Sequence, residues 1–346
     1  MSPATVNPAT VSTVRRRLRR RAVLVGSALA LVLLAVFVAA IAVGEYPIGV
    51  GDVIGALFGR GGPRTRYVVV RVRLPRALLG VLVGVAFGLS GAIFQRLLRN
   101  PLASPDVIGV TAGSSLAAVV GLVVFGVSGF AVPAVALAGG VVAAVLIYLL
   151  AWRRGVTGYR LVLVGIGVAA ALSGAVSYFL TRADVRVAAL ALIWLTGSLN
   201  GADWDRVRTI GVFLVVLVPA ALVLARSLAA LQLGDELARG LGARVESSRL
   251  GLLAVGVALA GVGTAVAGPV AFVAFVAGPI AARLLRTGRP GLPAAALTGA
   301  LVTLVADFVA QHLLGGAQLP VGVVTGAVGA PYLLYLLAKA NGGVRA

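Results

Sequence analysis

Ten apolar runs, each long enough to cross a lipid bilayer, constrain this chain more than any other feature. About 20 apolar residues in a helix cover a hydrocarbon core of roughly 30 Å. A hydrophobic share of 60% and a mean hydropathy of +1.07 lie far above those of soluble globular domains. The sequence therefore predicts an all-α polytopic membrane protein with ten transmembrane helices, at about 22–43, 77–94, 107–127, 130–151, 161–181, 209–225, 250–267, 270–285, 293–314 and 320–338.

The placement of the positive charge predicts the orientation of the chain. The net charge is +20, which by itself would suit a nucleic-acid-binding protein. With the N-terminus inside, however, 20 of the 30 Lys and Arg residues fall on the inner side, as the positive-inside rule requires. We therefore predict cytoplasmic termini and no nucleic-acid partner. The expected organisation is a tail over 1–21, disordered over 1–14, a membrane domain over 22–340, and a C-terminal tail over 341–346.

The sequence lacks the commonest catalytic and metal-site motifs. It has no Cys and a single His, His312, so it offers neither thiolate ligands nor a His cluster. It also has no phosphate-binding Gly-rich loop ending in Lys-Ser/Thr, no zinc-type spacing and no nucleophile elbow. We predict that this chain is not an enzyme and binds neither a metal nor a cofactor.

Asp307 is the clearest ionisable residue inside a predicted span. A transporter driven by protons or sodium usually needs buried carboxylates or ion sites in broken helices. A single Asp near the outer end of its span fits two interpretations, a satisfied structural carboxylate or a direct role in an ion-coupled secondary transporter. A membrane scaffold or receptor that transports nothing is a further alternative.

The segment 231–249 is polar and patterned, although it lies between two membrane-length runs. Its apolar residues recur every four positions, at Leu233, Leu237, Leu241 and Val245, and would line one side of a helix. Asp235 and Glu236 stand where the helix dipole favours anions, and Gly240 and Gly242 allow the helix to break and turn. A lone membrane-surface helix would carry basic residues on its polar face instead. We predict a short helix that docks into another protein.

Three further patterns bear on packing and on the outer surface. The spacing of Gly80, Gly84, Gly88 and Gly91 predicts a groove for close helix packing in lipid. Residues 45–76 are expected to form an outer loop rich in arginine. The apolar stretch 187–195 is too short to span the membrane, so it is expected to be interfacial or re-entrant.

Several motifs, in order along the chain, resemble those of the FecCD family of ABC-importer permeases. The similarity covers roughly residues 30–338. The motifs are Arg73-Leu74-Pro75-Arg76, the stretch 95–110 with Asn100-Pro101-Leu102-Ala103, Trp194-Leu195-Thr196-Gly197-Ser198-Leu199 with Trp204, the polar segment 231–246, Ala267-Gly268-Pro269-Val270-Ala271-Phe272-Val273, and Leu319-Pro320-Val321-Gly322 with Gly329-Ala330-Pro331.

This resemblance implies the BtuC-like fold of type II ABC importers and a place in the bacterial cytoplasmic membrane. It implies a second permease copy or paralogue, two cytoplasmic ATPase subunits that carry ATP and Mg, and an extracytoplasmic substrate-binding protein. The commonest cargo of the family is a ferric siderophore, and haem or cobalamin remain alternatives. ATP binding would move the coupling segment and switch the pathway between outward and inward access.

The resemblance also implies roles for individual residues. Coupling to the ATPase would involve Gly234, Asp235, Glu236, Ala238, Arg239, Leu241 and Gly242. Docking of the binding protein would involve Arg73, Arg76 and Gln311, where Gln311 departs from relatives that carry an Arg; ordinary interfacial snorkelling is the alternative for the two arginines. Asn100 and Leu102 would lie near the inner constriction of the pathway, or they would only build a rigid corner, since proline stops helices.

Overall fold

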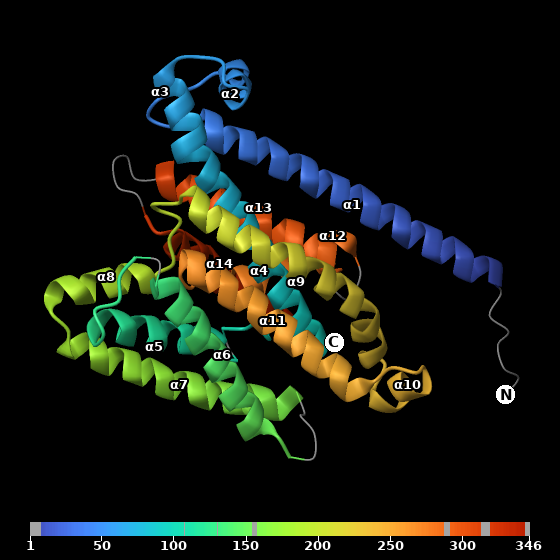
Figure 1. Ribbon diagram of the computed structural model, residues 1–346. Helices are drawn as coiled ribbons and strands as arrows, with labels where there is room; N and C mark the ends of the chain where they lie inside the picture. Colours follow the sequence, from blue (N-terminus) through green and yellow to red (C-terminus); the bar gives the residue numbers. More distant parts are fainter. Residues whose placement is uncertain are drawn as a thin grey trace, which may run out of the picture.

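The computed structural model describes residues 8–106, 108–129, 131–153, 158–286, 291–312 and 319–342. The regular elements of these residues are helices, and most of the long ones run side by side in one bundle (Figure 1). They are α1 (Pro8–Ala42), α2 (Val50–Leu57), α3 (Pro63–Arg66), the π-helix η1 (Tyr67–Arg73), α4 (Leu74–Leu97), α5 (Val110–Val123), α6 (Ala131–Ala151), α7 (Gly158–Arg182), α8 (Val185–Leu195), α9 (Trp204–Leu231), α10 (Asp235–Gly240), α11 (Val245–Ala267), α12 (Val273–Leu285), α13 (Leu292–His312) and α14 (Val321–Gly342).

The helices match the predicted spans closely. Among the described residues, seven helices are long and apolar enough to cross a membrane. Three of the shorter apolar helices, α5, α12 and α14, coincide with predicted spans, and α8 coincides with the short stretch expected to be interfacial or re-entrant. The predicted all-α membrane class is confirmed, whereas the count of ten spans stays a prediction.

Two boundaries differ from the prediction. Helix α1 begins at Pro8, so the expected disorder of 1–14 is wrong for residues 8–14, while residues 1–7 and 343–346 of the predicted tails lie outside the described residues. The expected loop 45–76 instead contains α2, α3 and η1, and Pro63–Leu97 forms one helix of 35 residues. Pro63 starts it at a first-turn position. Its π-helical segment ends two residues before Pro75, whose missing N–H removes one ordinary helical hydrogen bond.

Helix α4 is the centre of the bundle, and it packs against α13, α11, α12 and α9. Its glycines bring backbone against backbone, because a Cβ at Gly84 would lie 2.4 Å from the carbonyl oxygen of Gly299 and one at Gly88 would lie 2.4 Å from that of Ala295. In lipid, where hydrophobic association is weak, such close contact supplies the packing energy. The predicted glycine groove is confirmed, and it fixes α4 against α13.

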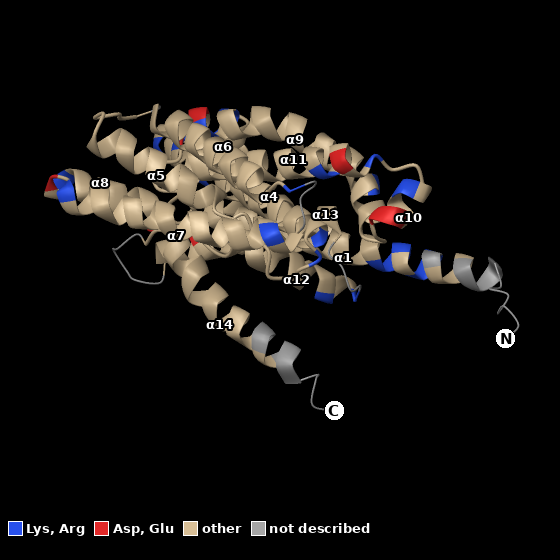
Figure 2. Ribbon diagram, turned by 90° about the horizontal axis from the view of Figure 1, so that it is seen from below, with Lys and Arg blue, Asp and Glu red and all other residues tan. Residues whose placement is uncertain are grey.

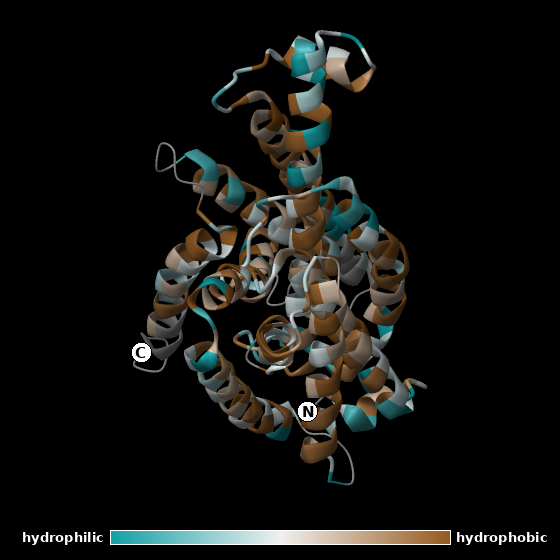
Figure 3. Cartoon of the chain, turned by 60° about the vertical axis from the view of Figure 1, so that its left-hand side comes forward, coloured by the Kyte–Doolittle hydropathy of each residue, from teal (hydrophilic) through white to brown (hydrophobic). Residues whose placement is uncertain are grey.

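The polar residues gather at the two ends of the bundle. Figure 2 shows charged residues at one end, on the N-terminal part of α1 and around α10. Most of the helices away from this end are tan, which means that they carry few charges. Figure 3 shows hydrophilic residues again on the segment of α2 and α3 at the top, above largely hydrophobic helices. We refer to these two regions as the α10 end and the α2 end of the bundle.

Candidate coupling, gating and docking sites

Helix α10 is a single short helix that the chain enters and leaves through glycines. Gly234 precedes it with φ of +111°, and Gly242 follows it with φ of +80°. The amide of Gly242 donates to the carbonyl of Arg239 and that of Ala243 to Ala238, both at 2.9 Å. This pair of bonds is the Schellman motif that ends helices with a left-handed residue. The sequence prediction of a glycine-broken helix is confirmed, with Gly242 making the turn and Gly240 remaining in the helix.

The apolar side of α10 points away from the bundle. Leu233, Leu237 and Leu241 are 53%, 62% and 68% exposed, whereas Ala238 is fully buried and anchors the helix. Val245 does not continue this row as predicted, because the turn at Gly242 separates it and it begins α11 as a buried residue. Three exposed leucines within nine positions, at the end of a bundle where charges gather, form a surface suited to a protein partner.

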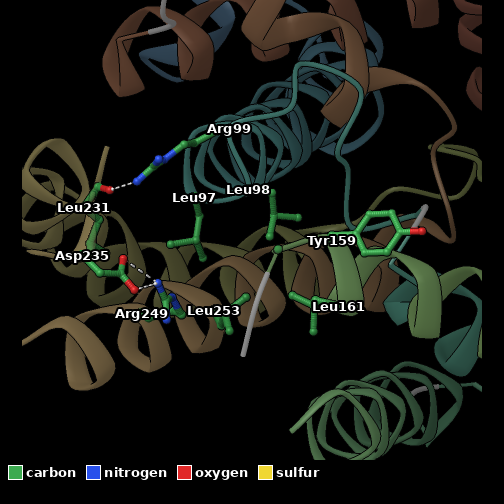
Figure 4. Close-up of a pocket in the computed structure, with 10 residues that line it drawn as sticks. Leu97, Leu98, Arg99, Tyr159, Leu161, Leu231, Asp235, Arg249 and Leu253 are labelled. Atoms are coloured by element: carbon green, nitrogen blue, oxygen red, sulfur yellow. Dashed lines mark hydrogen bonds and ion pairs between the residues drawn. The ribbon is translucent and has the colours of Figure 1, made fainter. Parts of the chain in front are cut away.

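The base of α10 is held by an ion pair that the sequence did not reveal. Arg249 of α11 donates to both carboxylate oxygens of Asp235 at 3.0 Å, and it reaches Glu246 at 3.3 Å. Beside this pair lies a cavity of about 320 Å³ that is also lined by Arg99, Leu231 and Tyr159 (Figure 4). The guanidinium of Arg99 donates to the carbonyl of Leu231 at 2.6 Å. Asp235 thus has a structural partner, while Glu236 and Arg239 are exposed.

The corner between α4 and α5 is shaped by Asn100. Its side-chain oxygen accepts from the amide of Leu102 at 2.9 Å, and its own carbonyl accepts from Ala103 at 3.1 Å. At the other end of the corner, Thr111 of α5 donates to Asp106 at 2.5 Å. These bonds agree with the interpretation of Asn100 and Leu102 as parts of a rigid corner at the α10 end. A lining role in the pathway stays a prediction.

At the α2 end, the three predicted docking residues lie on neighbouring helices but already have partners within the chain. Arg73 donates to the carbonyls of Ile41, at 2.8 Å, and of Tyr46, at 2.7 Å, and so caps the end of α1. Arg76 of α4 forms an ion pair with Asp307 of α13 at 2.9 Å, and the two side chains are only 12% and 3% exposed. Gln311 donates to the same carboxylate at 2.8 Å.

Three of the motifs that carried the resemblance cross near the same end. The amide of Ser198 donates to the carbonyl of Ala267 at 2.7 Å, and the amide of Gly322 donates to that of Gly197 at 3.1 Å. Gly197 has φ of +69°, and a Cβ there would lie 2.5 Å from the carbonyl oxygen of Pro269. Glycine is required at this crossing by both its backbone angle and its space. The motifs are visible in the sequence, but their meeting at one place is not.

The comparisons with known proteins agree with this architecture. Residues 22–339 match the FecCD transport family. The chain is 43% identical over 294 residues to the ferric enterobactin transport system permease protein FepG of Escherichia coli, covering 85% of this chain and 89% of that protein. It is 39% identical over 320 residues to the iron(3+)-hydroxamate import system permease protein FhuG of Bacillus subtilis, covering 90% and 95%. A solved inward-facing metal-chelate type ABC transporter is similar with a TM-score of 0.79 and 26% identity, covering 91% of this chain and 98% of that chain.

The bundle of apolar helices, which resembles a solved ABC transporter over 91% of this chain, defines a multi-pass membrane protein of the transport-permease class. The chain belongs to the FecCD transport family, and it is an ABC transport permease. The resemblance found from the motifs of the sequence is therefore confirmed.

Proposed function

We propose that this chain is the membrane-spanning subunit of an ATP-driven importer of ferric siderophores. The cargo rests on the relatives, which are named for ferric enterobactin and for iron(3+)-hydroxamate. The energy source rests on one observation above all, the row of exposed leucines on α10 and beside its two ends. A helix that presents Leu233, Leu237 and Leu241 outside the bundle needs a partner to cover them.

The partner at α10 would be a cytoplasmic ATPase subunit that carries ATP and Mg. The coupling surface would consist of Gly234, Asp235, Glu236, Ala238, Arg239, Leu241 and Gly242. Within this set the two flanking glycines set the angle of the helix, Ala238 anchors it, and Glu236, Arg239 and Leu241 are exposed for contact. With α10 in the cytoplasm, both termini are cytoplasmic as the charge distribution predicts.

The α2 end would then receive an extracytoplasmic binding protein. Arg73, Arg76 and Gln311 are proposed to contribute by holding the outer ends of α1, α4 and α13 in register. Directly charged contact is supported by a hollow of about 740 Å³ on this side, lined by Arg66, Arg71 and Arg208 among others. These arginines are exposed, so they would steer an acidic partner and set its orientation more than the affinity.

Substrate would pass between two permease copies, each with ten spans, or between this chain and a paralogue. Asn100 and Leu102 are proposed to lie near the inner constriction, because their corner is at the α10 end, next to the ATPase surface. Closure of the ATPases on ATP would move α10 and thereby tilt the helices on which it is built.

Purification of the full complex tests this function. The chain should co-purify with an ATPase subunit, and proteoliposomes should take up a ferric siderophore only with ATP and a binding protein. Uptake driven by a proton or sodium gradient without ATP would instead establish the ion-coupled alternative. A matched pair of substitutions, Leu237→Ser on α10 and Leu222→Ser on the exposed face of α9, separates loss of ATPase binding from a general effect of a lost leucine.

A further inference from the structure

The end of α4 carries an arginine where the backbone favours glycine. The amide of Arg99 donates to the carbonyl of Arg96 at 3.3 Å, and that of Asn100 to Gln95 at 3.0 Å, which is again the Schellman pattern. Arg99 is the left-handed residue of this motif, with φ of +50°. Helices usually place glycine there, because other L-residues meet steric strain. Helix α10, which ends in the same motif, does use glycine, at Gly242.

The side chain of Arg99 makes a contact that glycine could not make. Its Nη2 donates at 2.6 Å to the carbonyl of Leu231, the last residue of α9. A cation at the C-terminal end of a helix interacts favourably with the helix dipole, and a charge-assisted hydrogen bond is stronger than a neutral one. The same carbonyl accepts from the amide of Gly234 at 3.3 Å. Arg99 therefore holds the turn from which α10 starts.

The backbone of Arg99 leads directly into the corner of Asn100 and Leu102. Figure 4 shows Arg99 extending across the cavity toward Leu231, while Leu97 and Leu98 of the same helix end line it with apolar side chains. Asp235 and Arg249 lie on the other side of Leu231 and tie α10 to α11. The Arg99 bond thus joins the turn before α10 to the backbone that leads into the corner.

We propose that Arg99 is a positioning residue that transmits the displacement of α10 to the corner after α4, residues 98–106. This inference rests on the proposed function, since it assumes that an ATPase moves α10. When α10 moves, the Leu231 carbonyl moves with it, and the guanidinium follows because the bond is short and charged. The corner then shifts with the backbone of residue 99. The strain at this position is retained because the link needs the side chain.

The variant Arg99→Gly separates this role from a structural one, because glycine suits the left-handed backbone and should leave the helix end intact. In the complete complex, reconstituted with its ATPase and binding protein, we expect ATPase binding and hydrolysis to persist while uptake per ATP hydrolysed falls at least about tenfold. Arg99→Lys keeps the positive charge on a side chain of different length. Its uptake per ATP hydrolysed should lie between the values of the parent and of Arg99→Gly. Arg153→Gly, at another exposed arginine of the α10 end, is the matched control and should leave the ratio unchanged.

A distance measurement gives a readout besides activity. The chain has no Cys, so spin labels can be placed uniquely at Pro101→Cys in the corner and Arg244→Cys beside α10. With Arg99 present, ATP should leave the distance between the labels constant, because both segments move together. In Arg99→Gly, ATP should change it. A wild-type uptake ratio in Arg99→Gly, or equal distance changes with and without Arg99, would overturn the proposal. Absence of ATP-driven uptake in the parent complex would instead contradict the proposed function.

Discussion

Between α4 and α13 the chain omits side chains so that backbone meets backbone, whereas on α10 it presents large side chains that the described part of the chain does not cover. The first contact is complete within one subunit and tolerates no added atoms. The second leaves three leucines exposed, and exposed positions usually tolerate substitution with little loss of stability. The difference separates the helices whose contacts are complete within the subunit, which we call the fixed body, from a helix whose neighbouring leucines stay exposed.

The fixed body should fail most severely at Gly91. A Cβ at this position would lie 1.7 Å from the carbonyl oxygen of Ala274 in α12, and backbone cannot yield as a side chain can. We expect Gly91→Ala to cost more than about 5 kcal/mol, beyond ordinary overpacking, so that little folded protein accumulates. Gly174→Ala in α7 is the control, because a Cβ there meets no atom within 4 Å. Thermal unfolding in detergent measures both, and similar midpoints would contradict the packing argument.

The buried ion pair should come next. Asp307→Asn leaves the charge of Arg76 in a site that is only 12% exposed, which costs about 3 kcal/mol or somewhat more. Replacing both partners, with Asp307→Leu and Arg76→Met, should restore most of the stability. If Asp307 is structural, folded complexes of the single variant Asp307→Asn, which keeps Arg76, should retain ATP-driven uptake. Loss of all uptake in folded Asp307→Asn would favour the ion-coupled alternative.

At α10 the effect should appear in assembly and not in stability. Leu237→Ser changes an exposed residue, so the midpoint of unfolding of the isolated permease should shift by less than about 0.5 kcal/mol in equivalent free energy. Binding of the ATPase should weaken about 10- to 150-fold, because a leucine buried in an interface contributes about 1.5–3 kcal/mol. Titration of the ATPase against permease in nanodiscs measures this affinity. An unchanged affinity would mean that Leu237 does not contact the ATPase.

The smallest effect is expected at the base of α10. Asp235→Asn removes the ion pair with Arg249, but the two side chains are 40% and 19% exposed, so screening limits the loss to less than about 1 kcal/mol. The ratio of uptake to ATP hydrolysis should fall clearly, while the free energy of unfolding should change little. A large loss of unfolding free energy with an unchanged ratio of uptake to ATP hydrolysis would mean that this ion pair is part of the fixed body.

Local patterns predicted much of this architecture, because span length, glycine spacing and the four-residue leucine repeat are each read from neighbouring residues. The end of the leucine row was mistaken at Val245, since the repeat continues in the sequence although the chain turns at Gly242. Contacts between segments that are far apart in the sequence could not be predicted from such local patterns. Nothing adjacent to Asp307 indicates that Arg76 is its partner, and Arg99 stands 132 positions from the carbonyl it holds.

The single helix Pro63–Leu97 has a consequence for how far the permease reaches. Its 35 residues rise about 52 Å at 1.5 Å per residue, against a hydrocarbon core of roughly 30 Å. If the span begins near residue 77, as the hydropathy predicts, the first turns of this helix lie outside the hydrocarbon core. The exposed arginines on those turns, Arg64, Arg66 and Arg71, then lie outside the hydrocarbon core as well. A soluble partner can meet them in open solvent, before it has to displace any lipid.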